Sequence, residues 1–515
     1  MTIGATTEGA QHRGQLEKLA RRGTASVVGA GFSAGSGVLL VVIVTNGFSA
    51  TVAGSLFAAT SVFLILESVA LLGTDTGLVR WLPAHLASGR ARDVPRTLVV
   101  AGTPVLVLSL AATATLYLTA PTLAVHLAGP EAASAMATML QTLALVLPVA
   151  ALHDVVLAST RGLGTMRPTV VVENVGRLGL QSLAVLAVHL SGGGPLELAC
   201  AWSLPYVVGL VWAGWWLRGL VVRAYTPPGL SRSWGDLVVE FWSYTFPRAL
   251  ARITQTALKR SDIVLVAALA SPADAALYTA ATRFVVLGQL IVQSVQQALS
   301  PHLSTLFAKG ETGAAVSVFQ AATLWSMLAS WPIYLVTAGF AAPLMGIFGA
   351  GYDVASDVVV ILSLTMLLAT ACGPVDSVLL MAGRSWLSLR NSTVALAVNL
   401  GLNVVLIPLH GIRGAAIAWS VAIVVRNVLP LLQVRRHLGM WPVTGPTVLV
   451  AIGAVGCFGT AGVIGLVAGL PTPAEVAILL AGTLAYLAGV WTCRTRLGLD
   501  AFRTALRRRP STPAC

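Results

Sequence analysis

Apolar segments about as long as a membrane is thick recur along most of the chain, from residue 24 to residue 493. A membrane-spanning helix needs about 20 mostly apolar residues. Only 10% of the residues are charged, whereas a soluble domain has about 25%. We therefore predict an all-α polytopic membrane protein with about 14 transmembrane helices. They are expected at 24–46, 50–73, 96–119, 134–158, 169–190, 195–217, 239–269, 275–300, 318–340, 354–382, 387–408, 413–434, 445–469 and 474–493. A soluble enzyme and a secreted disulfide scaffold are excluded.

The positive charge of the chain indicates how it is oriented. The net charge of +13 comes from short runs of Arg and Lys between apolar segments, not from a basic domain, so no nucleic-acid partner is expected. With a cytoplasmic N-terminus, and with Arg96, Arg390 and Arg413 at span ends counted in the adjoining loops, the tails and even-numbered loops contain 24 of the 32 Lys and Arg residues. The odd-numbered loops contain only Arg413. Cytoplasmic loops are enriched in Lys and Arg. We therefore predict a plasma-membrane protein with both termini in the cytoplasm.

An internal repeat organises the predicted spans. At an offset of 221 residues, LFAATSVFLILE (56–67) aligns with LYTAATRFVVLG (277–288), and later Asp154 aligns with Asp376 at an offset of 222. Chance matching of apolar runs is the alternative explanation, but the repeat begins and ends at matching span numbers. Parallel repeats are related by an axis along the membrane normal. We predict a cytoplasmic tail (1–23), a first six-helix lobe (24–217), a cytoplasmic linker (218–238), a second six-helix lobe (239–434), two further helices (445–493) and a basic tail (494–515).

Four segments carry a resemblance to a known family. They are GTDTGLVRWLPAHLASGR at 73–90, LKRSDIVLVAALASPADAALYTAATRF at 258–284, QALSPHLSTLFAKGE at 297–311 and LLMAGRSWLSLRNSTVALAVNLGLNVVLIPLHGIRGAAIAWS at 379–420. With the two-lobe plan, they resemble the MOP exporter superfamily, which includes MATE transporters, and within it the Wzx-type polysaccharide or O-antigen flippases. The resemblance implies that a polyprenyl-pyrophosphate-linked oligosaccharide is moved from the inner to the outer leaflet by alternating access. Membrane lipids and the polymerase and glycosyltransferases of polysaccharide synthesis are the partners expected.

The seventh predicted span is unusually polar. Charged side chains inside a membrane are costly and usually face a cavity or a partner. At 100° per residue, five polar positions share one face of this helix: Arg248, Arg252, Gln255, Lys259 and Asp262. Guanidinium groups match phosphate oxygens bidentately, so this face is a candidate pyrophosphate site. Alternatively, Lys259, Arg260 and Asp262 lie near the outer end of the span, where they are solvated.

Other intramembrane polar residues are candidates for sugar binding or ion coupling. Arg283, Gln289 and Gln293 on the eighth span are candidates for binding sugar hydroxyls, although helix–helix hydrogen bonds explain the amides equally well. Glu67 has no partner nearby in sequence, and an unpaired buried carboxyl group can carry a proton. Glu67, Asp262 and Asp376 are the candidates for coupling to H⁺ or Na⁺. Glu173 and Arg177, four residues apart, favour an internal ion pair.

The sequence also excludes or weakens other functions. It contains no GxxxxGKS phosphate loop, zinc-binding motif or nucleophile elbow, and its five cysteines lack metal-ligand spacing. We expect no catalytic residues, no metal and no cofactor other than a coupled ion. A MATE-type cation antiporter, a polytopic cell-envelope glycan enzyme, a lipid II flippase and a membrane scaffold are the alternatives. The segment 81–96 is expected to form an amphipathic cytoplasmic helix whose Arg90, Arg92 and Arg96 contact anionic headgroups.

Overall fold

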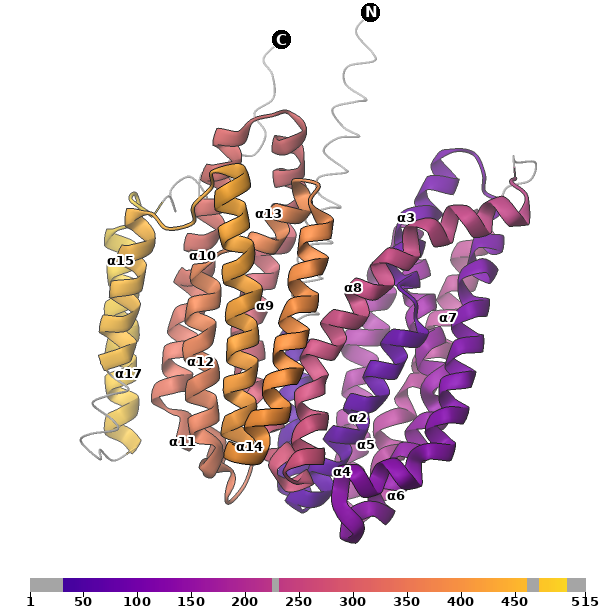
Figure 1. Cartoon of the computed structure of the whole chain (residues 1–515), viewed down its shortest axis with the longest axis horizontal. Coiled ribbons are helices and arrows are strands. Elements are labelled where there is room, and N and C mark those ends of the chain that lie inside the picture. The colour runs from indigo at the N-terminus through magenta and orange to yellow at the C-terminus, as the bar shows by residue number, and fades with distance from the viewer. Residues whose placement is uncertain (1–30, 225–230, 461–471, 498–515) are drawn as a thin grey trace, which may run out of the picture. The chain divides into compact units, whose positions relative to one another are not determined.

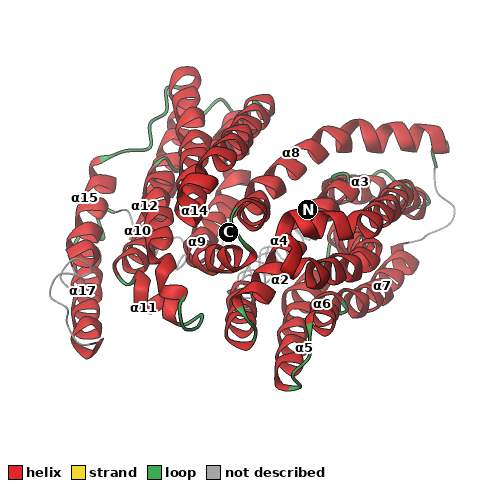
Figure 2. Ribbon diagram, turned by 60° about the horizontal axis from the view of Figure 1, so that its bottom comes forward, coloured by secondary structure: helices red, strands yellow, loops and turns green. Residues whose placement is uncertain are grey.

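The structure is a computed structural model that describes residues 31–224, 231–460 and 472–497. These ranges are helical and contain no β-strand (Figures 1 and 2), which confirms the predicted all-α class. The predicted tail 1–23, residues 225–230 of the linker and residues 498–515 of the basic tail lie outside the described residues. The helices form two compact units, up to Thr279 and from Ala280 onward.

The first unit contains eight helical segments and the start of a ninth among its described residues. They are Gly31–Gly47, α2 (Ala50–Ala70), α3 (Thr74–Ala87), α4 (Asp93–Gly162), the π-helix η1 (Thr169–Arg177) with α5 (Leu178–Leu190), α6 (Pro195–Ser203), α7 (Pro205–Ala224), α8 (Trp234–Leu269) and the start of α9 (Pro272–Ala308). The second unit contains the rest of α9 and the following elements: α10 (Thr312–Gly339), α11 (Ala341–Gly346), η2 (Tyr352–Ala355), α12 (Ser356–Ala371), α13 (Val375–Met381), α14 (Ser385–Leu438), α15 (Gly445–Ala454), η3 (Val455–Gly459) and α17 (Thr472–Thr492).

The helices have the length and apolarity of a multi-pass membrane protein. Nine helical stretches in the described ranges are long and apolar enough to cross a membrane. Two of these, α4 and α14, are each two helices joined at a glycine that has non-helical dihedral angles, Gly129 (φ 69°, ψ 171°) and Gly411 (φ 56°, ψ −136°). The more polar α8 is not among the nine, and Gly31–Gly47 and Gly445–Gly459 are shorter apolar helices. The total of 14 spans remains a prediction.

A break between α2 and α3 places Gly73 and Gly77 against α8. Leu72 (φ 49°) and Gly73 (φ 71°) both have left-handed backbone conformations, which end α2 and start α3 in a new direction. A Cβ atom on Gly73 would lie 2.8 Å from the backbone nitrogen of Ala249, and one on Gly77 would lie 2.3 Å from the Thr245 hydroxyl. Only glycine allows α8 to approach so closely.

The helix α8 belongs to the first compact unit. Its Leu237 and Phe241 are buried in a core cluster with Leu78 and Leu82 of α3 and Ala158 of α4. The compact unit therefore extends beyond the predicted first lobe of residues 24–217. The predicted lobes rest on the sequence repeat and remain a prediction.

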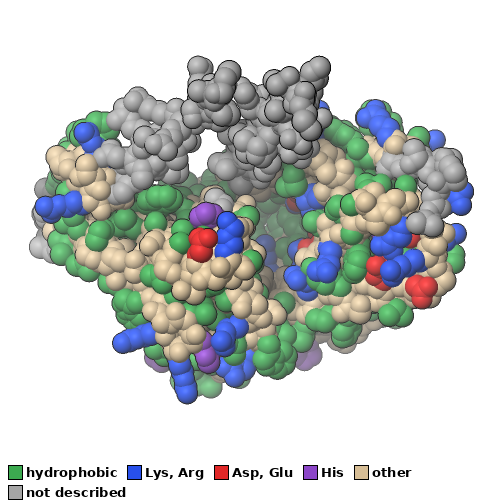
Figure 3. Space-filling model, turned by 90° about the horizontal axis from the view of Figure 1, so that it is seen from above, with side chains coloured by type: hydrophobic (Ala, Val, Ile, Leu, Met, Phe, Trp, Pro, Cys, Tyr) green, Lys and Arg blue, Asp and Glu red, His purple; other side chains and the backbone are tan. Residues whose placement is uncertain are grey.

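The single amphipathic helix expected over 81–96 is wrong. The helix α3 ends at Ala87, Gly89 has φ 70°, and α4 begins at Asp93. The arginines of this segment contact the start of α8: Arg90 lies 3.3 Å from Glu240, and Arg96 donates to the carbonyl of Arg232 at 3.1 Å. On the right of Figure 3, which views the molecule from above, Lys and Arg side chains gather beside Asp and Glu side chains. Ion pairing within the protein thus occupies Arg90.

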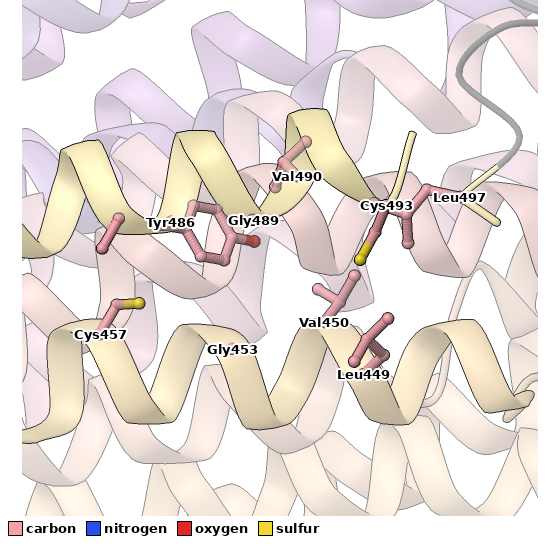
Figure 4. A pocket seen from close by; sticks show the side chains of 10 residues that line it. Leu449, Val450, Gly453, Cys457, Tyr486, Gly489, Val490, Cys493 and Leu497 are labelled. Atoms are coloured by element: carbon pink, nitrogen blue, oxygen red, sulfur yellow. The ribbon is translucent and has the colours of Figure 1, made fainter. Parts of the chain in front are cut away.

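In the second unit, α10, α12 and α14 pack side by side (Figure 1), and α15 and η3 pack on α10. The Tyr486 hydroxyl of α17 donates to the carbonyl of Leu328 at 2.9 Å, which fixes α17 to α10. An apolar pocket of about 120 Å³ lies between α15 and α17 (Figure 4). Its lining contains no charged side chain: Leu449, Val450, Gly453, Cys457, Ala485, Tyr486, Gly489, Val490, Cys493 and Leu497.

Candidate functional site

Ionisable side chains from several helices converge inside the first unit. Charges in an apolar interior are costly unless they are paired or hydrogen-bonded, so the contacts of this cluster are informative. The cluster is made of Glu67 from α2, Asp75 from α3, His153 and Asp154 from α4, Glu173 and Arg177 from η1, Tyr206 from α7 and Arg252 from α8. We call these eight residues the polar cluster.

The π-helix η1 holds one end of the polar cluster. Arg177 donates to both carboxylate oxygens of Glu173, at 2.6 and 2.5 Å, which confirms the ion pair expected from their spacing. The Arg177 guanidinium carbon also lies 4.3 Å from the centre of the Tyr206 ring. Arg177 is only 8% exposed, so both contacts are formed away from water. Short π-helical segments in α-helical proteins are frequent at functional sites.

His153 lies at the centre of the polar cluster with no exposed surface. Its Nδ1 is 3.6 Å from the nearer oxygen of Asp154, and its Nε2 is 3.8 Å from Glu173. Neither ring nitrogen has a hydrogen-bond partner within the described part of the chain. A Cβ atom on Gly209 of α7 would lie 2.8 Å from Nε2, so this glycine makes room for the ring.

Arg252 joins α8 to the polar cluster. It donates to Asp75, in the first turn of α3, at 2.6 Å, and its second nitrogen lies 3.8 Å from Asp154. The α2–α3 break at Leu72 and Gly73 places Asp75 within reach of this guanidinium. Asp75 is a residue that sequence analysis did not single out, because the ion pair joins positions 177 residues apart.

Glu67 is buried, with 7% of its surface exposed. Its carboxylate makes no hydrogen bond or ion pair with the residues that the structure describes, but electrostatic interactions link it to Asp154, Arg177, Glu173 and Arg252. Arg260 of α8 also interacts electrostatically with Glu67. Arg252, one of the predicted substrate-binding residues, is therefore among the charged groups that act on this ion-coupling candidate.

A second group of cations lies at the surface of the same unit. The guanidinium carbons of Arg80 on α3 and Arg248 on α8 lie 4.1 and 4.3 Å from the centre of the Tyr244 ring. The two carbons are therefore no more than 8.4 Å apart, the sum of those distances. Arg80 and Arg248 are exposed, and neither forms an ion pair within the described ranges. We call Arg80, Tyr244 and Arg248 the arginine sandwich.

Sequence analysis missed Arg80 although it lies in the family-like segment 73–90. Arg80 follows the second predicted span, where a cation could have indicated a binding site. Cations at such positions also orient the chain in the membrane, so they do not by themselves indicate binding. Tyr244, the partner of Arg80, lies 164 residues further along the chain. Only the packing of α3 on α8 reveals that they meet.

The remaining predicted residues occupy varied environments. On α8, Gln255 and Lys259 are exposed, and buried Asp262 accepts a 3.4 Å hydrogen bond from Tyr278. In the second unit, Arg283 is partly buried and Gln293 is exposed. The amide of Gln289 lies 3.9 Å from the Met366 sulfur, and Asp376 accepts a hydrogen bond from Ser388 at 2.5 Å. No group of three or more His, Cys, Asp or Glu residues in the described ranges is arranged to hold a metal ion.

Comparison with known proteins assigns the chain to a family. Residues 19–307, more than half of the sequence, match the family described as "Polysaccharide biosynthesis protein". The chain belongs to this family. Residues 247–409 also match the MatE family.

One curated relative is the "Probable low-salt glycan biosynthesis flippase Agl15" of Haloferax volcanii. It is 28% identical over 169 residues, which are 33% of this chain and 36% of that protein. The match therefore spans about a third of the length of this relative.

Solved structures of membrane transporters share the fold. The lipid II flippase MurJ in an inward closed conformation has a TM-score of 0.72 and 13% identity, covering 91% of this chain and 99% of that chain. An inward-facing multidrug resistance MATE transporter has a TM-score of 0.66 and 16% identity, covering 78% and 94%. A MOP superfamily transporter from Pyrococcus furiosus has a TM-score of 0.55 and 18% identity, covering 82% and 95%. The fold agrees with the predicted resemblance, and this protein is a multi-pass membrane protein.

Proposed function

We propose that the protein is a flippase that moves a polyprenyl-pyrophosphate-linked oligosaccharide, a precursor of a cell-surface polysaccharide, from the inner to the outer leaflet of the plasma membrane. The family match supports a role in polysaccharide synthesis. A curated relative described as a glycan biosynthesis flippase supports the transport step. In this proposal both termini are cytoplasmic, and glycosyltransferases and a polymerase act before and after the flippase.

The arginine sandwich is the observation that carries the proposal. Two exposed guanidinium groups lie against one tyrosine ring without a carboxylate partner in the described ranges. Like charges this close repel one another, and an anion that contacts both guanidinium groups reduces the repulsion. A diphosphate offers several oxygens to the planar donor sets of two guanidinium groups, which bind phosphate bidentately.

Charge and membrane potential give this site a direction of transport. The pyrophosphate binds Arg80 and Arg248 from the cytoplasmic side, while the polyprenyl chain stays in the lipid. Alternating access then exposes the headgroup to the outside, and an inside-negative potential favours that step by about 2.3 kcal/mol per negative charge per 100 mV.

The other predicted site residues have subsidiary roles in the proposal. Arg252 and Lys259 add cations to α8 and Gln255 adds an amide donor, and Arg283, Gln289 and Gln293 bind sugar hydroxyls. Glu67, Asp262 and Asp376 are the candidates for binding a coupled proton or sodium ion.

A cation antiporter and a polytopic glycan enzyme fit less well. An organic cation would meet the exposed guanidinium groups of Arg80 and Arg248 and be repelled. The matching relatives are flippases and transporters. No observation on the described residues favours either alternative.

Translocation in proteoliposomes tests the proposal. The full chain is reconstituted with a fluorescent polyprenyl-pyrophosphate oligosaccharide, and the fraction of probe that a membrane-impermeant quencher reaches is followed over time. We expect translocation by the wild type and by Arg92→Ala, which removes an exposed cation outside the sandwich. The double variant Arg80→Ala/Arg248→Ala should translocate at least about tenfold more slowly, since each lost charged hydrogen bond is worth about 1.5–3 kcal/mol. Equal rates for the two variants would rule out the arginine sandwich as the headgroup site.

A further inference from the structure

Both ends of α14 lie at the same end of the second unit and carry arginines. The chain turns back at Gly411, and the buried amides of Asn391 and Gln433 hydrogen-bond to each other twice, at 2.8 and 2.9 Å. The two halves of the helix are therefore side by side here. Four arginines lie at or near these two helix ends, and we call them the α14 arginines: Arg384, Arg390, Arg435 and Arg436.

The α14 arginines form no ion pair with a carboxylate in the part of the chain that the structure describes. Arg435 lies 4.9 Å from the centre of the Trp441 ring, which is uncharged. In the first unit, by contrast, Arg90 and Arg232 both pair with Glu240, at 3.3 and 3.4 Å. Orientation in the membrane requires positive charge on one side, but it does not require arginines without acidic partners. The α14 arginines therefore suit an anion from outside the chain.

Arg390 and Arg436 lie at the end of the surface that faces lipid. Residues four apart share a helix face, and Arg390 is four residues from Trp386 and from Val394, which are 71% and 40% exposed. Arg436 likewise follows Leu432, which is 53% exposed, by four residues. Exposed apolar side chains of a membrane-spanning helix face lipid, and tryptophan is enriched where the apolar core meets the headgroups. Both guanidinium groups are therefore expected at headgroup depth.

We propose that the α14 arginines bind the phosphate of an anionic phospholipid, whose acyl chains lie along the two halves of α14. Guanidinium donors match phosphate oxygens bidentately, and basic pockets between membrane helices bind anionic headgroups. Val404 on the first half and Val421 on the second are exposed, so both halves offer an apolar surface to the chains. In the predicted orientation the lipid belongs to the cytoplasmic leaflet. The site lies outside the arginine sandwich and does not rest on the proposed function.

A phospholipid fits this surface better than other sources of phosphate. A soluble phosphate ester would use the guanidinium groups but leave the exposed Trp386 and Leu432 without an apolar partner. The polyprenyl-pyrophosphate oligosaccharide of the proposed function has a large polar headgroup that must leave the leaflet. A phospholipid has a small headgroup that stays at the membrane surface, beside the apolar faces of α14.

Native mass spectrometry of the full chain with added lipid tests binding. The probes are phosphatidylglycerol and phosphatidylcholine with identical acyl chains. We expect the wild type to bind phosphatidylglycerol about tenfold or more tightly than phosphatidylcholine, because cations near the headgroups attract anionic lipids. Arg390→Gln/Arg436→Gln should lose most of this preference. The control Arg92→Gln/Arg167→Gln removes the same charge from exposed positions of the first unit and should keep it. An equal loss in both variants would show that net charge alone matters and overturn the proposal.

Photo-crosslinking of the wild type locates the lipid without any variant. Phosphatidylglycerol with a photoreactive headgroup is added to the full chain in nanodiscs, and the labelled peptides are identified by mass spectrometry. We expect label in residues 384–390 and 432–441, from the two ends of α14. Label confined to other segments would reject the site, even if the double variant does not fold.

Competition distinguishes the possible sources of the phosphate. Glycerol 3-phosphate, which has no acyl chains, and a polyprenyl-pyrophosphate oligosaccharide should each leave the labelling of 384–390 unchanged. Displacement by the first would assign the α14 arginines to soluble phosphates, and displacement by the second to the transported lipid; either result would overturn the phospholipid site. None of these measurements requires flipping, so a failure of the proposed function with normal phosphatidylglycerol binding remains distinguishable from a failure of this inference.

Discussion

Arg177 satisfies two different groups with one buried guanidinium. It forms two hydrogen bonds to Glu173 and lies over the ring of Tyr206. Replacing it leaves the Glu173 carboxylate partly buried without its cation, and removing one partner of a buried ion pair costs about 3–5 kcal/mol. We therefore expect Arg177→Gln to lower the stability of the purified protein by about this amount, measured as loss of folded protein on heating in detergent.

The double variant Arg177→Gln/Glu173→Gln distinguishes the stability lost with the ion pair from the stability lost with side-chain packing. It removes both charges and should recover part of the lost stability, because no uncompensated charge remains. A double variant that is as unstable as the sum of the two single variants would show that the ion pair does not account for the loss.

Single residues also show where sequence analysis reached its limit. The Glu173–Arg177 pair was predictable because both partners lie one turn apart on the same helix. The environment of His153 was not, since Glu173, Tyr206 and Gly209 reach it from η1 and α7 through packing alone. For the same reason the sequence indicated Arg252 as a cation for substrate but not its contacts with Asp75 and Asp154.

The close approach of α2 to the start of α9 depends on one glycine. A Cβ atom on Gly54 would lie 1.6 Å from the carbonyl oxygen of Pro272, and a backbone atom cannot turn aside as a flexible side chain can. We expect Gly54→Ala to cost at least about 3 kcal/mol, the upper end of the usual overpacking range. Gly102→Ala is the control, because nothing lies within 4 Å of a Cβ atom there; comparable melting temperatures for the two variants would contradict the packing described.

The two long helices α4 and α14 each turn at a glycine that other residues cannot replace. Gly129 and Gly411 combine positive φ with ψ values of 171° and −136°, a region almost restricted to glycine. We expect Gly129→Ala and Gly411→Ala each to lose about 1–3 kcal/mol of stability, visible as a lower melting temperature. Gly401→Ala, with no atom within 4 Å of its Cβ, should be neutral or stabilising; a loss equal to that of Gly411→Ala would argue against the turn.

The positions of helices were predicted well where a long apolar stretch marks them, and poorly where a helix is interrupted. Hydrophobic length marked the regions of α2, α4, α12 and α14. The end of α3 at Ala87 was missed because the segment 81–96 keeps an amphipathic pattern across Gly89, whose left-handed conformation ends the helix. The π-helix η1 was missed because the apolar period of residues 169–177 does not distinguish it from an α-helix.

Across the whole chain, the distribution of Lys and Arg predicts the orientation in the membrane. With 24 of 32 such residues on one side and Arg413 alone in the loops on the other, the C-terminus is expected in the cytoplasm. An epitope fused after Cys515 should therefore bind antibody only after the membrane has been permeabilised. A second epitope, inserted beside Arg413, should bind without permeabilisation, and the reverse pattern would invert the proposed direction of transport.

The most direct test of the central claim is the leaflet distribution of polyprenyl-pyrophosphate glycans in cells of the native host that lack this gene. If the protein is the flippase, complete repeat units should accumulate in the cytoplasmic leaflet. Wild-type protein and Arg92→Ala should restore them to the outer leaflet, and Arg80→Ala/Arg248→Ala, present in the membrane at an equal level, should not. An unchanged glycolipid distribution in the deletion strain, together with increased sensitivity to cationic dyes, would contradict the account and favour a cation antiporter.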